Sequence, residues 1–294
     1  MLGKQKITDI EYQLSWGTIA GISNAVNQPE DQQTIKLCVH GWLDNAASFL
    51  PLMSQLENVI AIDWPGHGLS HHRSVDAHYH FIDYIYDLLE LFEVNQWPAI
   101  DIIGHSMGGM IASAFAAAFP EKVKSLTLID SIGFITSEAD KTVENLRQGL
   151  LSRLNQINKQ KKLIHTSKIH NNLDSAIKAR VKVSDLIYQD AKLLVERGTK
   201  PVEQGFTWRS DPRLTTKSPL RLSLAQAEQI VSNINVPVQL IYGEKGMEIV
   251  KSGIEHYQKL FKSFKSTKLV GGHHVHMEKP KATAALIKYF INSI

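Results

Sequence analysis

The first half of the chain alternates short apolar runs with segments whose apolar residues recur at helical spacing. Four runs rich in Ile, Val and Leu have the length and composition of strands buried on both faces. Between the second and third runs, apolar residues recur every three or four positions, which is typical of an amphipathic helix. The runs are 35–39, 59–62, 100–103 and 126–129, and the helical positions are Tyr79, Ile82, Ile85, Leu88, Leu89 and Phe92. This alternation predicts a parallel sheet with crossover helices.

The remaining patterns complete a prediction of the fold. The opening segment, up to about Val26, predicts an antiparallel hairpin at the sheet edge, and the runs 236–242 and 267–270 continue the sheet. From Phe134 to Arg221 the strand rhythm stops and polar stretches with helical spacing take over, which include Leu146, Leu150, Leu151, Leu154 and Ile157. We therefore predict an α/β fold whose mostly parallel sheet has eight strands, with helices on both faces. Its core would be formed by residues 1–133 and 222–294, with a helical cap, residues 134–221, inserted after the sixth strand.

Composition excludes several classes of protein. The hydrophobic share of 43% and the charged share of 21% are ordinary for a globular protein. The net charge of +3 is too small to indicate nucleic-acid binding. No apolar run approaches the ~20 residues that span a bilayer, and neither a secretory signal nor a terminal Ser-Lys-Leu address is recognisable. The single cysteine, Cys38, fits a reducing compartment, so a cytoplasmic location is expected.

The charge is unevenly distributed. Residues 134–221 contain 17 Lys and Arg against 9 Asp and Glu, whereas the rest of the chain contains 15 basic and 20 acidic residues. Such asymmetry indicates two differently built parts. The excess in the predicted cap would either solvate helix faces or attract an anionic substrate, such as a CoA thioester.

The strongest chemical signal is Gly104-His105-Ser106-Met107-Gly108. It follows the apolar run 100–103 and precedes a helix-prone run, 110–119. A strand–turn–helix of this kind holds its serine strained and exposed at a helix N-terminus, where the helix dipole favours developing negative charge. The glycines are expected because the turn has no room for a Cβ on either side. Ser106 is therefore the predicted nucleophile.

This motif, in this context, resembles the nucleophile elbow of the α/β-hydrolases. Further stretches resemble one branch of that superfamily, the serine hydrolase-like proteins, and together they span most of the chain. They are residues 40–46, 66–70, 104–109, 196–199, 209–214 and 273–277. The resemblance implies a serine hydrolase, but it does not specify the substrate.

The resemblance also implies the base and the oxyanion hole. The segment 272–280 matches the C-terminal Gly-His-x-x-His-x-Glu-x-Pro pattern of many α/β-hydrolases, in which the histidine after the glycine reaches the nucleophile. His273 is the expected base because its pKa lies near neutrality, and His274 and His276 are the alternatives. The backbone N–H groups of Trp42 and Met107 would form the oxyanion hole.

Other residues near these motifs are interpreted as structural. His40 precedes the oxyanion loop, and the segment 63–70 resembles the Asp-x-x-Gly-x-Gly-x-Ser turn of the superfamily. We interpret this turn as scaffold, in which Gly66 and Gly68 supply unusual backbone angles. A catalytic role for Asp63 or His67 is the minor alternative.

The acid departs from the commonest pattern of the superfamily. That pattern places an aspartate three residues after a glycine behind the penultimate strand, where this chain has Gly243-Glu244-Lys245-Gly246. An aspartate stands one strand earlier, Asp130, at a position that haloalkane dehalogenases use. Asp130 is therefore the predicted acid, which orients the imidazole and stabilises the imidazolium. Glu248 and Glu244 remain as alternatives.

These expectations add up to a serine hydrolase of the carboxylesterase type. Ser106 would attack a small-molecule ester or thioester, and water would hydrolyse the acyl-enzyme. No cofactor or metal is implied, and a serine at position 106 argues against dehalogenase and epoxide hydrolase chemistry. The rival interpretations are a hydrolase-fold binding protein with little turnover, and a cofactor-free lyase or perhydrolase that uses the same serine. The sequence predicts neither the acyl chain length nor the oligomeric state.

Overall fold

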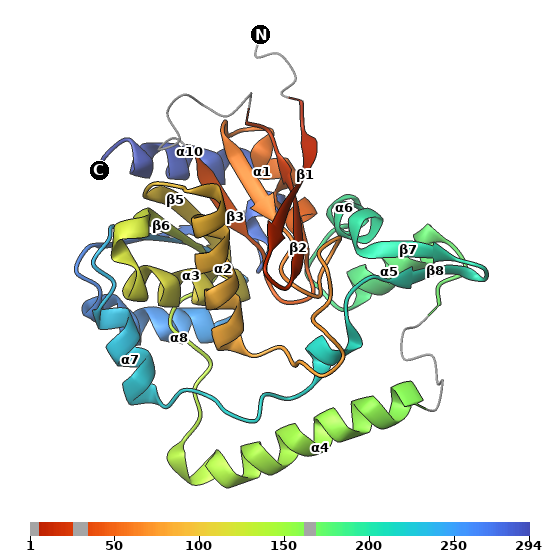
Figure 1. The fold of residues 1–294 in the computed structure, drawn as a ribbon. Coiled ribbons are helices and arrows are strands. Elements are labelled where there is room, and N and C mark those ends of the chain that lie inside the picture. The colour runs from red at the N-terminus through yellow and green to blue at the C-terminus, as the bar shows by residue number, and fades with distance from the viewer. Residues whose placement is uncertain (1–5, 26–34, 162–168) are drawn as a thin grey trace.

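A single twisted sheet forms the centre of the molecule (Figure 1). The computed structural model describes residues 6–25, 35–161 and 169–294. The sheet has eight strands in the order β1-β2-β4-β3-β5-β6-β9-β10, of which β1 and β2 form an antiparallel hairpin and the other six run parallel. The strands are β1 Thr8–Leu14, β2 Gly17–Ser23, β3 Lys36–Val39, β4 Val59–Ile62, β5 Ile100–His105, β6 Val123–Ile129, β9 Val238–Gly243 and β10 Phe264–Leu269. The predicted α/β architecture and edge hairpin are confirmed.

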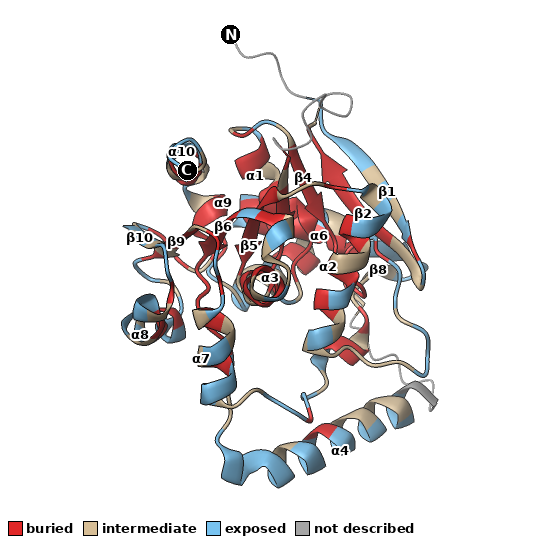
Figure 2. Cartoon of the chain, turned by 60° about the vertical axis from the view of Figure 1, so that its left-hand side comes forward, coloured by how far each residue is buried: buried red, intermediate tan, exposed pale blue. Residues whose placement is uncertain are grey.

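Helices cover both faces of this sheet. One face packs against α2 (Phe81–Asn95), α3 (Met107–Ala118), α7 (Leu224–Ser232) and α8 (Glu248–Tyr257), and the other packs against α1 (Leu50–Met53), α9 (Val275–Glu278) and α10 (Pro280–Ile291). Alternate residues of the strands supply the two cores: Leu37 and Val39 face the first group, and Cys38 faces the second. The central strands are buried on both faces, as Figure 2 shows in red. Their continuous apolar runs therefore reflect double burial.

One aromatic residue of the predicted helix lies outside it. Tyr79 precedes α2, and its hydroxyl donates to Asp211 Oδ2 at 2.8 Å. The helical spacing is real from Tyr84 onward, where the side chains of Tyr84, Ile85 and Leu88 are buried. Tyr79 fits the pattern only because a ring that packs beside a helix has the same apolar surface as one within it.

The segment between β6 and β9 carries its own small core. It contains α4 (Thr142–Lys161), α5 (Leu173–Lys182), α6 (Tyr188–Gly198) and an antiparallel hairpin, β7 (Thr199–Val202) with β8 (Gly205–Trp208). Residues 162–168 of this segment lie outside the described residues. Buried side chains of α5 and α6, among them Ile177 and Leu194, pack together with Met277 of α9. The hairpin was not predicted from the helical spacing of this segment.

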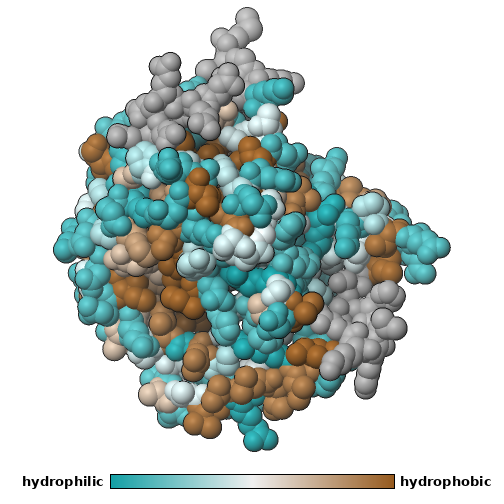
Figure 3. All heavy atoms as spheres, in the orientation of Figure 1, coloured by the Kyte–Doolittle hydropathy of each residue, from teal (hydrophilic) through white to brown (hydrophobic). Residues whose placement is uncertain are grey.

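Helix α4 stands apart from the other helices, along the lower edge of the molecule (Figure 1). Its apolar residues are largely exposed, and Figure 3 shows apolar side chains along this edge. Val143 is 76% exposed and Leu154 is 53% exposed. The predicted helical periodicity is therefore present, although its apolar positions are not buried in the core.

No helix of the described residues is both long enough and apolar enough to cross a membrane.

Candidate functional site

Ser106 occupies a strained turn between β5 and α3. Its backbone has φ 51° and ψ −119°, a conformation that a non-glycine residue adopts only when the surroundings impose it. Two contacts with the end of β6 hold it there: Ser106 N donates to Ile129 O at 3.1 Å, and Ser131 Oγ donates to Ser106 O at 2.8 Å. The next residue, Met107, begins α3, so Ser106 lies at the helix N-terminus.

The glycines on either side of Ser106 are required by close packing. A Cβ on Gly104 would lie 2.6 Å from Gly109 Cα, and a Cβ on Gly108 would overlap with the carbonyl oxygen of Val39. The turn therefore brings β5, α3 and the end of β3 together at backbone contact. This is the geometry that the Gly-x-Ser-x-Gly spacing predicts.

His273 lies on the loop after β10 and is hydrogen-bonded to Asp130. Its Nδ1 is 2.6 Å from Asp130 Oδ2, so an Nδ1 proton donated to this carboxylate leaves Nε2 able to accept one. Asp130 is buried (1% exposed), whereas 21% of the His273 side chain is accessible. A buried acceptor that fixes an accessible imidazole is the relationship between an orienting acid and a base.

Backbone N–H groups hold the Asp130 carboxylate in place. Oδ1 accepts from Gly243 N at 3.2 Å, and Oδ2 accepts from Met247 N at 3.1 Å. Asp130 itself has a positive φ of 42°, and its N–H donates to Ile241 O at 2.8 Å. The residue thus turns out of β6 while it stays tied to β9, which directs its side chain toward the loop that carries His273.

The alternative acids lie elsewhere. Glu244 and Glu248 are both exposed, and Glu248 Oε2 pairs with Lys251 Nζ at 3.3 Å on the outer surface of α8. Gly246, which stands where the commonest pattern has its aspartate, packs against Asp130 instead. Of the candidate acids, Asp130 is therefore the one that the structure brings to His273.

His105 links the nucleophile turn to the His273 loop. It directly precedes Ser106, its Nε2 donates to the backbone carbonyl of His273 at 3.1 Å, and the two rings are 4.6 Å apart. Ser106 and His273, both of which the structure describes, are not hydrogen-bonded to each other.

The loop after β3 approaches Ser106 closely. A Cβ on Gly41 would lie 3.0 Å from Ser106 Cβ, so the backbone that leads into Trp42 passes beside the nucleophile. The Trp42 indole N–H donates to Leu214 O at 3.1 Å, which fixes the side chain against the segment between β6 and β9. The other predicted oxyanion donor, Met107 N, is the first N–H group of α3, a position that has no carbonyl partner within a helix.

Two of the residues interpreted as scaffold sit in hydrogen-bond networks of the fold. His40 accepts from Trp64 N at 3.0 Å, and its other nitrogen contacts Gly41 O at 2.7 Å. Asp63 accepts from Ala46 N at 2.7 Å and from Leu69 N at 2.8 Å, and it also pairs with Arg197 of α6. The carboxylate of Asp63 is therefore fully occupied.

The glycines of this turn have the unusual angles expected from the sequence. Gly66 has φ 78° and Gly68 has φ 49°. A Cβ on Gly68 would also overlap with the Asp63 carboxylate.

The other two histidines of the C-terminal motif lie behind His273 in a buried cluster. His274 is held between two carboxylates, with Nδ1 2.6 Å from Asp185 Oδ1 and Nε2 3.2 Å from Asp44 Oδ2. Burial opposes its charge, but the two carboxylates outweigh burial and raise its pKa to about 9. His276 is fully buried, and this burial, together with the neighbouring His274, lowers its pKa to about 3.

The sequence did not predict that the residues of this cluster contact one another. Asp44 also receives Arg180 of α5, and the Asp44 pKa lies below its ordinary value because His274 and Arg180 outweigh the effect of burial. Asp44, Asp185 and His274 belong to three segments that are distant in the sequence. No spacing in the sequence could therefore have indicated that they meet.

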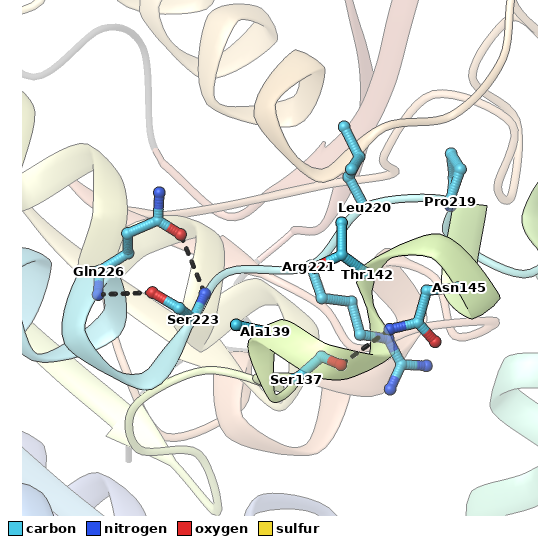
Figure 4. Close-up of a pocket in the computed structure, with 9 residues that line it drawn as sticks. All are labelled: Ser137, Ala139, Thr142, Asn145, Pro219, Leu220, Arg221, Ser223 and Gln226. Atoms are coloured by element: carbon cyan, nitrogen blue, oxygen red, sulfur yellow. Dashed lines mark hydrogen bonds between the residues drawn. The ribbon is translucent and has the colours of Figure 1, made fainter.

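A small pocket lies away from these residues. It is lined by residues at the start of α4 and by the segment that leads into α7, including Arg221, Asn145 and Gln226 (Figure 4). Asn145 Nδ2 donates to Ser137 Oγ at 2.7 Å at its wall. Neither Ser106 nor His273 lines it, so it is not the pocket of the candidate active site.

Residues 37–280 match the family described as alpha/beta hydrolase fold, and the chain belongs to this family. It is 32% identical to the serine hydrolase-like protein of Danio rerio over 98% of this chain and 89% of that protein. It is 28% identical to serine hydrolase-like protein 2 of Homo sapiens over 97% of this chain and 94% of that protein. Among solved structures, hypothetical protein PA1622 from Pseudomonas aeruginosa PAO1 matches with a TM-score of 0.87 and 33% identity, covering 97% of this chain and 98% of that one. The fold and these relatives support a hydrolase.

Proposed function

We propose that the protein is a serine hydrolase that cleaves carboxylic esters or thioesters of small molecules through an acyl-enzyme on Ser106. His273 is the general base, Asp130 orients it, and the N–H groups of Trp42 and Met107 form the oxyanion hole. The observation that carries the proposal is the 2.6 Å hydrogen bond between Asp130 and His273, next to a serine with a positive φ at a strand–helix turn.

The reaction follows from the roles of these atoms. Ser106 Oγ attacks the carbonyl carbon while His273 Nε2 takes its proton, after a side-chain rotation has brought the two atoms into contact. The carbonyl oxygen becomes negative and is stabilised by backbone N–H groups, each of which is worth ~10²–10³ in rate in a comparable site. His273 returns the proton to the departing alcohol or thiol, and water then attacks the acyl-enzyme by the same route. Asp130 stabilises the imidazolium without taking the proton.

We also propose that residues 134–221 form a cap over the site. The support comes from ionic contacts between this segment and the loops that follow the parallel strands. Arg197 of α6 pairs with Asp63 after β4, and Arg180 of α5 pairs with Asp44 after β3. In open α/β sheets the substrate binds outside the carboxyl ends of the strands, so a segment anchored to these loops roofs that crevice.

A fluorophosphonate probe tests the nucleophile. We expect one label per chain, at Ser106, and we expect Ser106→Ala to abolish both labelling and hydrolysis of simple esters and thioesters, since the triad acts as a unit. Ser252→Ala, which removes an exposed serine of α8, is the matched control and should label fully. Labelling of the Ser106→Ala variant at the level of this control would contradict the proposal.

A further inference from the structure

Three buried side-chain atoms that can coordinate a metal ion come from separate segments and lie close together behind the candidate active site. They are Asp44 Oδ2, His105 Nδ1 and His274 Nε2, and all three lie within 4.8 Å of one another. His274 Nε2 is 3.2 Å and His105 Nδ1 is 3.6 Å from Asp44 Oδ2. A zinc ion with ligands at 2.0–2.1 Å in tetrahedral geometry separates them by about 3.4 Å. The two separations from Asp44 Oδ2 are thus close to the spacing of ligand atoms in a metal site.

The second polar atom of each of these side chains already has a partner. His274 Nδ1 contacts the Asp185 carboxylate at 2.6 Å, His105 Nε2 contacts the His273 carbonyl at 3.1 Å, and Asp44 Oδ1 receives Arg180. Outer partners of these kinds, a carboxylate or a backbone carbonyl on the far ring nitrogen, orient the ligands of protein metal sites.

The outer partners also determine where the lone pairs point. A carbonyl oxygen can only accept, so His105 carries its proton on Nε2 and presents the lone pair of Nδ1 to the cluster. His105 is fully buried, and no described residue hydrogen-bonds to its Nδ1. A buried lone pair that faces a carboxylate costs free energy, and a cation bound between them would remove this cost.

The Gly41 backbone packs beside these atoms. A Cβ on Gly41 would lie 3.1 Å from His105 Nδ1 and 3.4 Å from Asp44 Oδ2, so the loop after β3 runs close to both. The same Cβ would lie 3.0 Å from Ser106 Cβ, which places the cluster beside the nucleophile. Asp44 and Arg180 also line a small cleft.

We propose that Asp44, His105 and His274 bind a divalent transition metal ion of the zinc type, and that the bound ion inhibits hydrolysis. Binding displaces the proton on His274 Nε2, and Asp185 and Arg180 complete the outer shell. The inhibitory part rests on the proposed function. His105 directly precedes Ser106, and its ring lies 4.6 Å from that of His273, so an ion bound to His105 is held beside both the nucleophile and the base.

Metal binding is tested first without reference to activity. The chelator-treated full-length protein is dialysed against Zn²⁺, and its Co²⁺ form is examined by absorption spectroscopy. We expect one ion per chain and the d–d bands of a tetrahedral site. His105→Gln keeps a donor for the His273 carbonyl and removes the Nδ1 ligand, and His274→Asn keeps the donor to Asp185 and removes the Nε2 ligand. Each should weaken binding at least 10-fold.

Two further variants serve as controls for misfolding and for adventitious metal binding. Asp185→Asn changes only an outer partner, whose side chain is 31% exposed, and it should weaken binding by about 10-fold or more. His256→Gln removes an exposed histidine paired with Glu228 on another surface and should leave binding unchanged. Absence of a bound ion in the native protein, or a loss confined to His256→Gln, would overturn the site.

Inhibition is measured separately as the ratio of ester hydrolysis with and without one equivalent of Zn²⁺. We expect the rate with Zn²⁺ to be at most one tenth of the rate without it in the native protein. In Asp185→Asn, at the same free Zn²⁺ concentration, the two rates should be nearly equal. Stoichiometric binding without inhibition would overturn the inhibitory part alone. If no ester or thioester is hydrolysed under any condition, the proposed function fails, while the Co²⁺ spectrum still decides whether the ion binds.

Discussion

Asp130 occupies the space that a side chain at Gly246 would need. A Cβ on Gly246 would overlap with Asp130 Oδ1, and the backbone on either side of Gly246 donates to the same carboxylate through Gly243 N and Met247 N. The turn after β9 is thus wrapped around a carboxylate that comes from the end of β6. In this chain, a side chain at position 246, where the commonest pattern has its acid, would overlap with the Asp130 carboxylate.

This overlap predicts strong coupling between the two positions. Gly246→Ala should destabilise the protein because the methyl group displaces the Asp130 carboxylate. Asp130→Ala should make room for it. In a double-mutant cycle in urea, the free energy of unfolding of the double variant should exceed the value expected from adding the two single effects by about 1–3 kcal/mol. Additive effects would show that the turn can move away from Asp130.

The role of Asp130 in turnover is a separate prediction. Asp130→Asn keeps the shape of the side chain, but its amide can donate to His273 Nδ1 and favour the tautomer that leaves Nε2 protonated. We expect kcat to fall steeply, toward the ~10⁴-fold loss known for this change in a trypsin-like triad, with the labelling site unchanged. Glu244→Gln and Glu248→Gln should each cost little. A loss in Glu248→Gln as large as that of Ser106→Ala, with Asp130→Asn still active, would place the acid after β9.

His67 predicts how stability depends on pH. It is buried, and burial lowers its pKa to about 3, with the neighbouring His40 adding to the effect. Because the unfolded chain binds a proton at this residue below pH ~6.5 and the folded chain does not, the stability from neutral His67 is present above pH ~6.5 and is lost as the pH falls toward 3.

Substitution of His67 isolates this contribution. His67→Asn keeps a donor for the Pro65 carbonyl, which His67 Nδ1 contacts at 3.1 Å, and removes the titration. Between pH 7 and pH 5 the native protein should lose about 2 kcal/mol more of its unfolding free energy than the variant. If the free energy of unfolding of the two proteins depended on pH in the same way, His67 would not be a neutral buried imidazole.

The positive charge of residues 134–221 predicts little steering of anionic substrates. Several of its arginines are engaged with buried carboxylates: Arg180 with Asp44, Arg197 with Asp63, and Arg213 with Asp211. Charges paired in this way contribute little to a long-range field. We expect kcat/KM for a CoA thioester and for a neutral ester to change equally between low salt and 0.15 M, where the Debye length is about 8 Å. A steeper fall for the thioester would indicate steering.

The pairing also explains part of the uneven distribution of charge along the sequence. The acidic excess lies in residues 1–133 and 222–294 and the basic excess lies between them. Asp44 and Asp63 stand in the first part, and Arg180 and Arg197 stand in the second. Part of the imbalance is therefore the two sides of one set of contacts.

Features with a local signal were predictable from the sequence. The central strands are recognisable as continuous apolar runs because both of their faces are covered. The turn at Ser106 is recognisable by its two glycines, which are required because Gly104 and Gly108 pack at backbone contact. The hairpin β7–β8 was missed because each of its strands has only four residues, and because the first is largely exposed and contains Pro201. Its signal was Gly205, which has a φ of 134° and precedes Phe206, Thr207 and Trp208, three residues with high strand propensity.

Features that depend on distant segments were not predictable. The choice of Asp130 over Glu248 depends on which carboxylate the turn after β9 surrounds, and the cluster of Asp44 and His274 depends on the folding of both onto β5. A pattern search reads neighbours along the chain, whereas these contacts join residues more than 100 positions apart.

The pairing of Asp63 with Arg197 sets an order of events during synthesis. Asp63 receives the N–H groups of Ala46 and Leu69 from its own neighbourhood, but its cationic partner is 134 residues further along the chain. At ~5–20 residues per second on the ribosome, about 7–27 s separate the appearance of the two side chains. Until Arg197 has been made, the Asp63 carboxylate lacks this cationic partner. Closure by α6, which also brings Arg197 to Asp9 of β1, therefore completes the amino-terminal part of the fold only after most of the chain has been made.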